Sequence, residues 1–144
     1  MKKQILSVCA ALLLIAAVGA VTAPAQSSTK LEANIPFDFI IGNKTLPAGM
    51  YEVSSPVPNQ PSVRMLSSAE TREAAVALTV TTEPKTNRGA NKLVFHRYGD
   101  RYFLAEIWGE DGKIAQALRK SKLEREMSAS IGTPSVILVA VNSR

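Results

Sequence analysis

The residues best suited to chemistry surround the single histidine of the chain. His96 lies between Phe95 and Arg97, and the carboxylates of Asp100 and Glu106 follow closely in the sequence. A histidine beside a carboxylate can act as the general base that activates a serine nucleophile. No Gly-x-Ser-x-Gly nucleophile elbow is present, and a lone histidine in a strand more often packs or faces solvent. A small hydrolase using His96 with a nearby carboxylate is therefore the alternative hypothesis, not the main one.

Aromatic residues gather in the same segment. The candidate ligand-binding residues are His96, Tyr98, Tyr102 and Trp108. Aromatic rings displayed on a sheet can bind a sugar or a peptide. The same rings can form a hydrophobic core, and we favour that interpretation.

A second candidate site is a basic segment made of Arg119, Lys120, Lys122 and Arg125. Such a segment can contact anionic lipid headgroups, a cell-wall polymer or an acidic patch on another protein. Glu124 and Glu126 dilute the positive charge, so a solvated helix face is the favoured interpretation.

The sequence predicts neither a metal site nor a cofactor. Glu110, Asp111 and Gly112 could offer oxygen ligands, but they lack the spaced acidic residues of a calcium loop, and Asp-Gly is common in turns. Neither the phosphate-binding nor the dinucleotide-binding glycine pattern occurs.

The first 25 residues have the features of a secretory signal peptide. Lys2 and Lys3 precede an apolar run over residues 5–20, and Ala23-Pro24-Ala25 fits a small-x-small cleavage pattern. A retained membrane anchor is the alternative, but the run is short for a spanning helix. We therefore expect export to the periplasm or the medium, with no transmembrane segment after cleavage.

Residues 26–144 would then form a single β domain, long enough for one hydrophobic core. The only cysteine, Cys9, lies in the leader, so the exported chain would have no disulfide. Loss of Lys2 and Lys3 lowers the net charge from +5 to +3, which does not indicate a nucleic-acid partner. An envelope protein, a polymer or a lipid remain as possible partners.

The elements that must position these residues are predicted from alternation of apolar and polar residues. From Lys30 to Ile41 the odd positions are all apolar, which predicts a strand with one buried face. Pro36 cannot donate a ladder hydrogen bond, so the segment is either an edge strand or two shorter strands bent there. Turn residues follow at 42–44 and 47–49.

The segment 92–108 predicts a tight hairpin around Gly99-Asp100, with the glycine at the first position of a type II′ turn. Apolar groups occupy both faces of this hairpin, so we expect it to be central or covered on both sides. The register that the turn sets pairs Arg97 with Tyr102, His96 with Phe103, and Phe95 with Leu104.

The period of the pattern changes at Ser121. Ser121 and Glu124 fit a capping box, which predicts one short helix from Lys122 to about Ala129. The apolar run from Ser135 to Asn142 predicts a buried last strand. The whole pattern predicts an all-β fold, an antiparallel β-sandwich or small barrel of about 7–8 strands with this helix near the C-terminus.

Three stretches resemble a set of small exported bacterial proteins of uncharacterised function. They are IPFDFIIGNKTLPAGMYEV at 35–53, KLVFHRYGDRYFLAEIW at 92–108 and RKSKLERE at 119–126. The shared patterns are I-P-F-x-F-x-x-G-x-x-x-L-P-A-G-x-Y and L-V-F-x-R-Y-G-D-x-Y-F-L-x-E-I-W. The resemblance covers most of the chain after the leader. It implies a shared fold and export, and it supplies no catalytic or ligand-binding residue.

The main functional prediction is a non-catalytic exported β-module with a binding or structural role in the cell envelope or outside the cell. A further possibility is an assembly subunit that adds a strand to a neighbour. That role would require an unpaired strand edge at 30–34 or 135–142.

Overall fold

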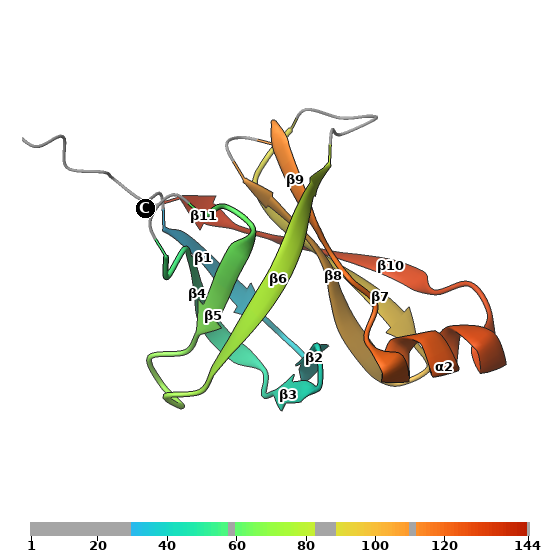
Figure 1. Cartoon of the computed structure of the whole chain (residues 1–144). Helices are drawn as coiled ribbons and strands as arrows, with labels where there is room; N and C mark the ends of the chain where they lie inside the picture. Colours follow the sequence, from blue (N-terminus) through green and yellow to red (C-terminus); the bar gives the residue numbers. More distant parts are fainter. Residues whose placement is uncertain (1–29, 58–59, 83–88, 110–111, 144) are drawn as a thin grey trace, which may run out of the picture.

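The structure is a computed structural model that describes residues 30–57, 60–82, 89–109 and 112–143. It shows an all-β domain with one short helix near the C-terminus, as the sequence predicts (Figure 1). The strands are β1 (Leu31–Ile35), β2 (Phe39–Ile41), β3 (Lys44–Leu46), β4 (Gly49–Ser54), β5 (Val63–Ser67), β6 (Ala74–Thr82), β7 (Lys92–Tyr98), β8 (Arg101–Gly109), β9 (Ile114–Leu118), β10 (Ser135–Ala140) and β11 (Asn142–Ser143), and the helix is α2 (Lys122–Ile131). The expected leader and the turn residues Glu110 and Asp111 lie outside the described residues.

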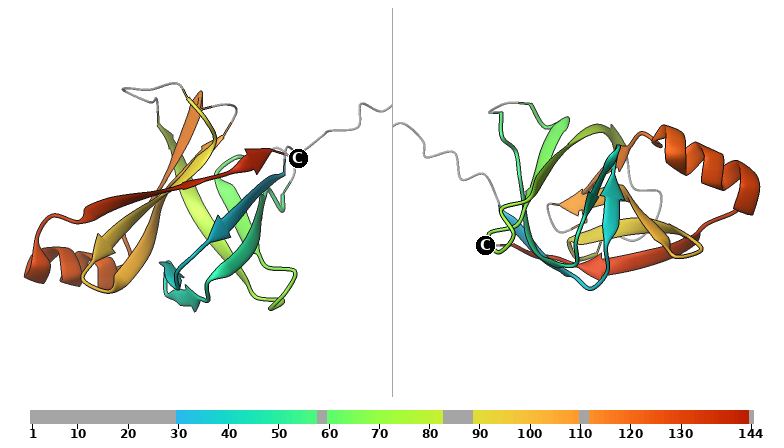
Figure 2. Two further views of the ribbon diagram at one scale, coloured as in Figure 1. Left: turned by 180° about the vertical axis from the view of Figure 1, so that it is seen from behind. Right: turned by 90° about the horizontal axis from the view of Figure 1, so that it is seen from below.

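The strands form one curled sheet with the order β10-β7-β8-β9-β6-β5-β4-β1-β11. All neighbours on this path are antiparallel, and β2 adds a parallel contact with β8 at Ile40 and Phe103. The end strands β10 and β11 do not pair with each other but follow one another along the chain (Figure 2). The sheet therefore curls around a core without closing into a barrel.

Pro36 divides the first alternating segment into two strands. In β1 the apolar residues Leu31, Ala33 and Ile35 are buried and Asn34 is exposed, as the alternation predicts. Strand β2 begins after the proline and pairs with β3 and β8 instead of the neighbours of β1. Because β2 passes between two packed layers, all three of its residues are buried. Of the two interpretations that the sequence allowed, the bent pair of strands is confirmed.

The β7–β8 hairpin has the predicted register at all three predicted pairs: Arg97 with Tyr102, His96 with Phe103, and Phe95 with Leu104. Gly99 has a φ of +59°, which glycine adopts without the steric penalty of a Cβ atom. A bulge between Val94 and Phe95 then shifts the pairing, so that Val94 faces Glu106. The hairpin lies between β10 and β9 in the sheet, which confirms its predicted central position.

The main core fills the concave side of the sheet. Phe39, Tyr51 and Phe95 lie at its centre, each at most 2% exposed. The ring of Phe39 meets those of Tyr51 and Phe95 edge-on, at centroid distances of 5.1 and 5.5 Å. This geometry places the positive ring edge against the negative ring face and adds to the burial energy.

Helix α2 covers a smaller apolar cluster on the opposite, convex side of the hairpin. Leu123 and Met127 lie four residues apart on one helix face and pack against Ile40, Tyr98 and Phe103. This second cluster explains why both faces of the hairpin are apolar. The helix runs two residues beyond the predicted end at Ala129.

The last strand is a correction to the sequence-based prediction. The run from Ser135 to Asn142 was expected to be buried, but Val136 and Leu138 are 58% and 59% exposed. Strand β10 lies at the end of the strand path, so only its inner residues face the core. Val139 and Val141 are buried, and the alternate residues face outward.

Candidate functional site

His96 and Glu124 form a partly buried pair between β7 and α2. The distance from His96 Nδ1 to Glu124 Oε1 is 2.9 Å, and the two side chains are 24% and 5% exposed. The convex face of β7 presents the imidazole, and the first turn of α2 presents the carboxylate. A carboxylate in the first turn of a helix is favoured by the helix dipole.

The start of the helix is capped as predicted, but only on one side. The Glu124 backbone N–H donates to Ser121 Oγ at 3.1 Å. In a reciprocal capping box the Glu124 side chain would bond back to the backbone of Ser121. Here its carboxylate reaches His96 instead, so it fastens the helix to the sheet.

The carboxylates that the sequence placed beside His96 have other roles. Glu106 Oε2 accepts a hydrogen bond from Trp108 Nε1 at 2.7 Å, and Asp100 is exposed in the hairpin turn. Glu124 lies 28 residues from His96 in the sequence, so proximity along the chain could not reveal it. Any hydrolase hypothesis must therefore use the His96–Glu124 pair.

The candidate aromatic residues already have neighbours on their rings. Tyr98 is fully buried beneath α2. Tyr102 stacks on Phe37 at a centroid distance of 3.9 Å, and Lys92 Nζ lies 4.2 Å from the centroid of the Trp108 ring. These contacts fit the interpretation of the aromatic residues as packing groups.

The basic segment is spread between the end of β9 and the exposed side of α2. Lys120 Nζ lies 3.4 Å from the hydroxyl of Tyr98, and Lys122 pairs with Glu126 at 3.8 Å. Arg119 and Arg125 are exposed. Leu118 of β9 pairs with Thr79 of β6. If this register continues by one residue, Arg119 lies opposite Leu78.

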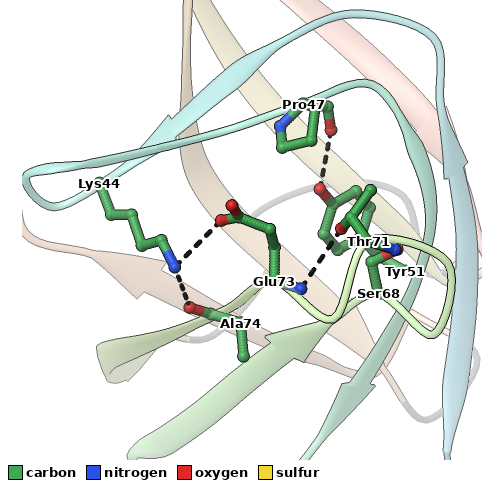
Figure 3. Close-up of polar contacts among 7 residues, drawn as sticks. All are labelled: Lys44, Pro47, Tyr51, Ser68, Thr71, Glu73 and Ala74. Carbon is green, nitrogen blue, oxygen red and sulfur yellow. Dashed lines mark hydrogen bonds and ion pairs between the residues drawn. The ribbon is translucent and has the colours of Figure 1, made fainter.

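A polar cluster around Tyr51 fastens the corner at Leu46–Gly49. The Tyr51 hydroxyl donates to the carbonyl oxygen of Pro47 at 2.8 Å (Figure 3). On the other side of the corner, Asp38 Oδ1 accepts from the Ala48 N–H at 2.9 Å. Burial raises the pKa of Tyr51, and the negative charges of Glu73 and Asp38 raise it further.

The β5–β6 turn completes this cluster. Lys44 Nζ lies 3.1 Å from Glu73 Oε2 and donates to the Ala74 carbonyl at 2.9 Å (Figure 3). The Glu73 N–H donates to Thr71 Oγ1 at 3.3 Å. These bonds tie the β2–β3 hairpin to the β5–β6 turn, so the groups act as a structural clasp. The sequence did not predict this cluster, although the spacing of Tyr51, four residues after Pro47, is the local feature that allows their hydrogen bond.

A second polar cluster spans β5 and β9. Gln116, 2% exposed, accepts from Arg64 Nε at 2.5 Å and donates to the Pro61 carbonyl at 2.6 Å. Arg64 also donates to Ser55 Oγ at 2.6 Å. The polar groups of this cluster are engaged with one another, as buried polar groups must be to offset the loss of water.

An apolar surface that the fold does not explain lies on the outer face of β5 and β6. We call this surface the β6 strip; its members are Val63, Met65, Val76, Leu78 and Val80. The register pairs Val63 with Leu78 and Met65 with Val76, so these side chains share one face. Val76, Leu78 and Val80 are 58%, 70% and 52% exposed. The inward residues of β6 are the small Ala75, Ala77 and Thr79.

Comparison of the chain with models of protein families, with curated proteins and with solved structures found no match. The resemblance to small exported bacterial proteins therefore stays a prediction. Among the described residues, no group of three or more histidine, cysteine, aspartate or glutamate side chains could hold a metal ion. No helix in the described part of the chain is long and apolar enough to cross a membrane.

Proposed function

We propose that this chain is a non-catalytic exported β-module that binds another envelope or extracellular protein through the β6 strip. The observation that supports the proposal is that β6 exposes its large apolar side chains and buries its small ones, the reverse of the usual arrangement. Three large aliphatic residues face outward, more than half exposed, while small residues face the core. Each large aliphatic side chain left in water forgoes on the order of 1 kcal/mol of hydrophobic stabilisation. A contiguous apolar patch of this kind marks an interaction surface.

The chemistry of the strip favours a protein as the partner. Its side chains are aliphatic and offer neither an aromatic platform nor hydrogen-bonding groups for a sugar polymer. Arg119 is exposed and borders the strip opposite Leu78, and Lys120 follows it. The complementary surface would be an apolar patch with carboxylates along one border.

A photo-crosslinking residue at position 78 tests this proposal in the cells that export the protein. We expect an adduct of discrete mass that contains a second protein, because Leu78 lies at the centre of the strip. The matched control is a probe at Thr45, which is exposed on β3, a strand that contributes no residue to the strip. An Arg119→Glu change should weaken the adduct, because it reverses the charge at the border. Equal adducts at both positions, or none at position 78, would overturn the proposal.

A small hydrolase is the second candidate, because the His96–Glu124 pair could serve as a base and its orienting carboxylate. A panel of chromogenic esters, assayed with the purified exported protein, separates the two functions. We expect no turnover that depends on His96. Turnover that disappears in a His96→Gln variant would replace the binding proposal with a catalytic one.

A further inference from the structure

We propose that the outer edge of β10 pairs with β10 of a second copy of this chain, so that two sheets join into one across an antiparallel strand pair. This inference concerns a surface other than the β6 strip and holds whether or not the proposed function does.

In the described part of the chain, no strand pairs with the outer edge of β10, although β1 contacts β10, and the pairing of β1 with β11 carries it towards the Ala140 end. Strand β10 begins the strand path and pairs with β7 over six residue pairs, from Ser135 with Arg97 to Ala140 with Lys92. The following strand, β11, pairs with β1. Seen from behind, β10 runs across the molecule from α2 to β11 (Figure 2, left). Its backbone groups on the side away from β7, towards the Ser135 end and around Ile137, can therefore accept another strand.

Strand β10 lacks the usual features that protect an edge. Soluble proteins guard such edges with charged residues, prolines or bulges. The residues of β10 are Ser-Val-Ile-Leu-Val-Ala, with no charge and no proline. Its register with β7 is continuous, so no bulge twists the strand away. An unprotected edge of this kind suits a strand that is covered in the assembled state.

The exposed side chains of β10 complement themselves. Val136 and Leu138 face outward, and Ile137 and Val139 face the core side. An antiparallel pair centred on Ile137 would set Val136 of each copy against Leu138 of the other, on one face of the joined sheet. Ile137 of each copy would face its own counterpart on the other face. In this register apolar side chains meet across the new pair without any like-charge contact.

A second copy fits this edge better than the N-terminal part of the same chain. Leu31 pairs with Ser143, so β1 begins beside β11, beyond the Ala140 end of β10. The position of Ser143 is about 17 Å from Leu138 along a strand.

The surface area that the β10 pair would bury determines the affinity that we expect for the dimer. A single strand pair buries less than the roughly 1,600 Å² of a standard interface. The dimer should therefore be reversible, with a Kd in the micromolar range.

Sedimentation equilibrium of the exported protein, produced from the whole chain, tests the inference. We expect the average mass to rise from monomer towards dimer between about 1 and about 100 µM, the range set by a micromolar Kd. A Leu138→Lys change should leave a monomer over this range, because it places a charge in the strand pair. The matched control is Leu78→Lys, which adds the same charge at a leucine on β6 that is also more than half exposed, and this variant should still dimerise. Circular dichroism of both variants verifies that they fold.

A charge-swap experiment tests the register. Leu138→Lys and Val136→Glu variants should each be monomeric alone and should form a heterodimer when mixed, because the new charges face each other. A parent protein that stays monomeric at every concentration would overturn the inference and leave the edge to a strand from another protein. A dimer that survives Leu138→Lys but is lost in Leu78→Lys would also overturn it.

Discussion

At the scale of single residues, the buried titratable side chains of Tyr51 and Glu124 make hydrogen bonds that stabilise the fold. Tyr51 and Glu124 are each almost fully buried; Tyr51 bonds the corner that precedes its own strand, and Glu124 bonds His96 from a distant segment. Such groups are costly to bury unless they are satisfied, which is why their partners lie within hydrogen-bond distance. Substitution of Tyr51 or Glu124 should therefore lower the free energy of unfolding.

Tyr51 gives a prediction about alkaline pH. Burial, together with the charges of Glu73 and Asp38, raises the pKa of Tyr51 above its ordinary value of 10.0. The folded state then holds the phenol proton more tightly than the unfolded state, so stability is unaffected below about pH 10 and falls as the pH rises above it. Tyr51→Phe should cost about 1 kcal/mol at neutral pH, through loss of the bond to Pro47, and should reduce this alkaline decline.

Urea unfolding of Tyr51→Phe and the parent protein between about pH 8 and about pH 11 measures both effects. An alkaline decline that is equally steep in the variant would show that another group causes it.

At the scale of elements, local rules predicted those segments whose structure depends on near neighbours. The face of β1, the break at Pro36, the hairpin register and the Ser121 cap all follow from residues close together in sequence. The outer faces of β6 and β10 do not. An apolar residue on a strand faces the core only if another layer covers it, and that depends on strand order.

The same limit applies to the candidate site. The sequence identified His96 as a notable residue, but its partner Glu124 comes from a helix that packs on the sheet only in the folded state. The capping-box pattern would instead place the Glu124 side chain in a hydrogen bond with the backbone of Ser121. Fastening α2 to the sheet thus depends on a tertiary contact that no local spacing encodes.

The pair between His96 and Glu124 gives a prediction about the docking of α2. Glu124→Ala should cost about 1–3 kcal/mol of unfolding free energy, because it leaves the imidazole of His96 without its partner. Glu124→Gln should cost less, since its amide can still bond to Nδ1. Glu126→Ala is the matched control: the Glu126 side chain is 60% exposed and pairs with Lys122 over 3.8 Å, so its loss should cost at most a few tenths of a kcal/mol.

Urea unfolding and hydrogen exchange of the α2 amides report on these variants. If Glu124→Ala and Glu126→Ala cost the same, the buried pair does not fasten the helix.

At the scale of the whole molecule, the described part of the curled sheet buries a main core and a smaller cluster beneath α2, and the β6 strip and the outer side of β10 leave apolar side chains exposed. The β6 strip and the edge of β10 lie on strands that three others separate in the sheet order. The two proposals are therefore compatible: the β6 strip would bind a different protein while the edge of β10 would join two copies. A dimer would then present two β6 strips, which strengthens binding to a partner that offers two sites.

The central claim is that the β6 strip serves binding and contributes little to the fold. The measurement that tests it most directly is the crosslinking yield from a photo-reactive residue at position 76, compared between the parent protein and its Leu78→Lys variant. We predict that the partner adduct falls to background in the variant, while its unfolding free energy stays within about 0.5 kcal/mol of the parent because Leu78 is 70% exposed. An adduct that persists at the parent level in a folded Leu78→Lys variant would contradict the claim.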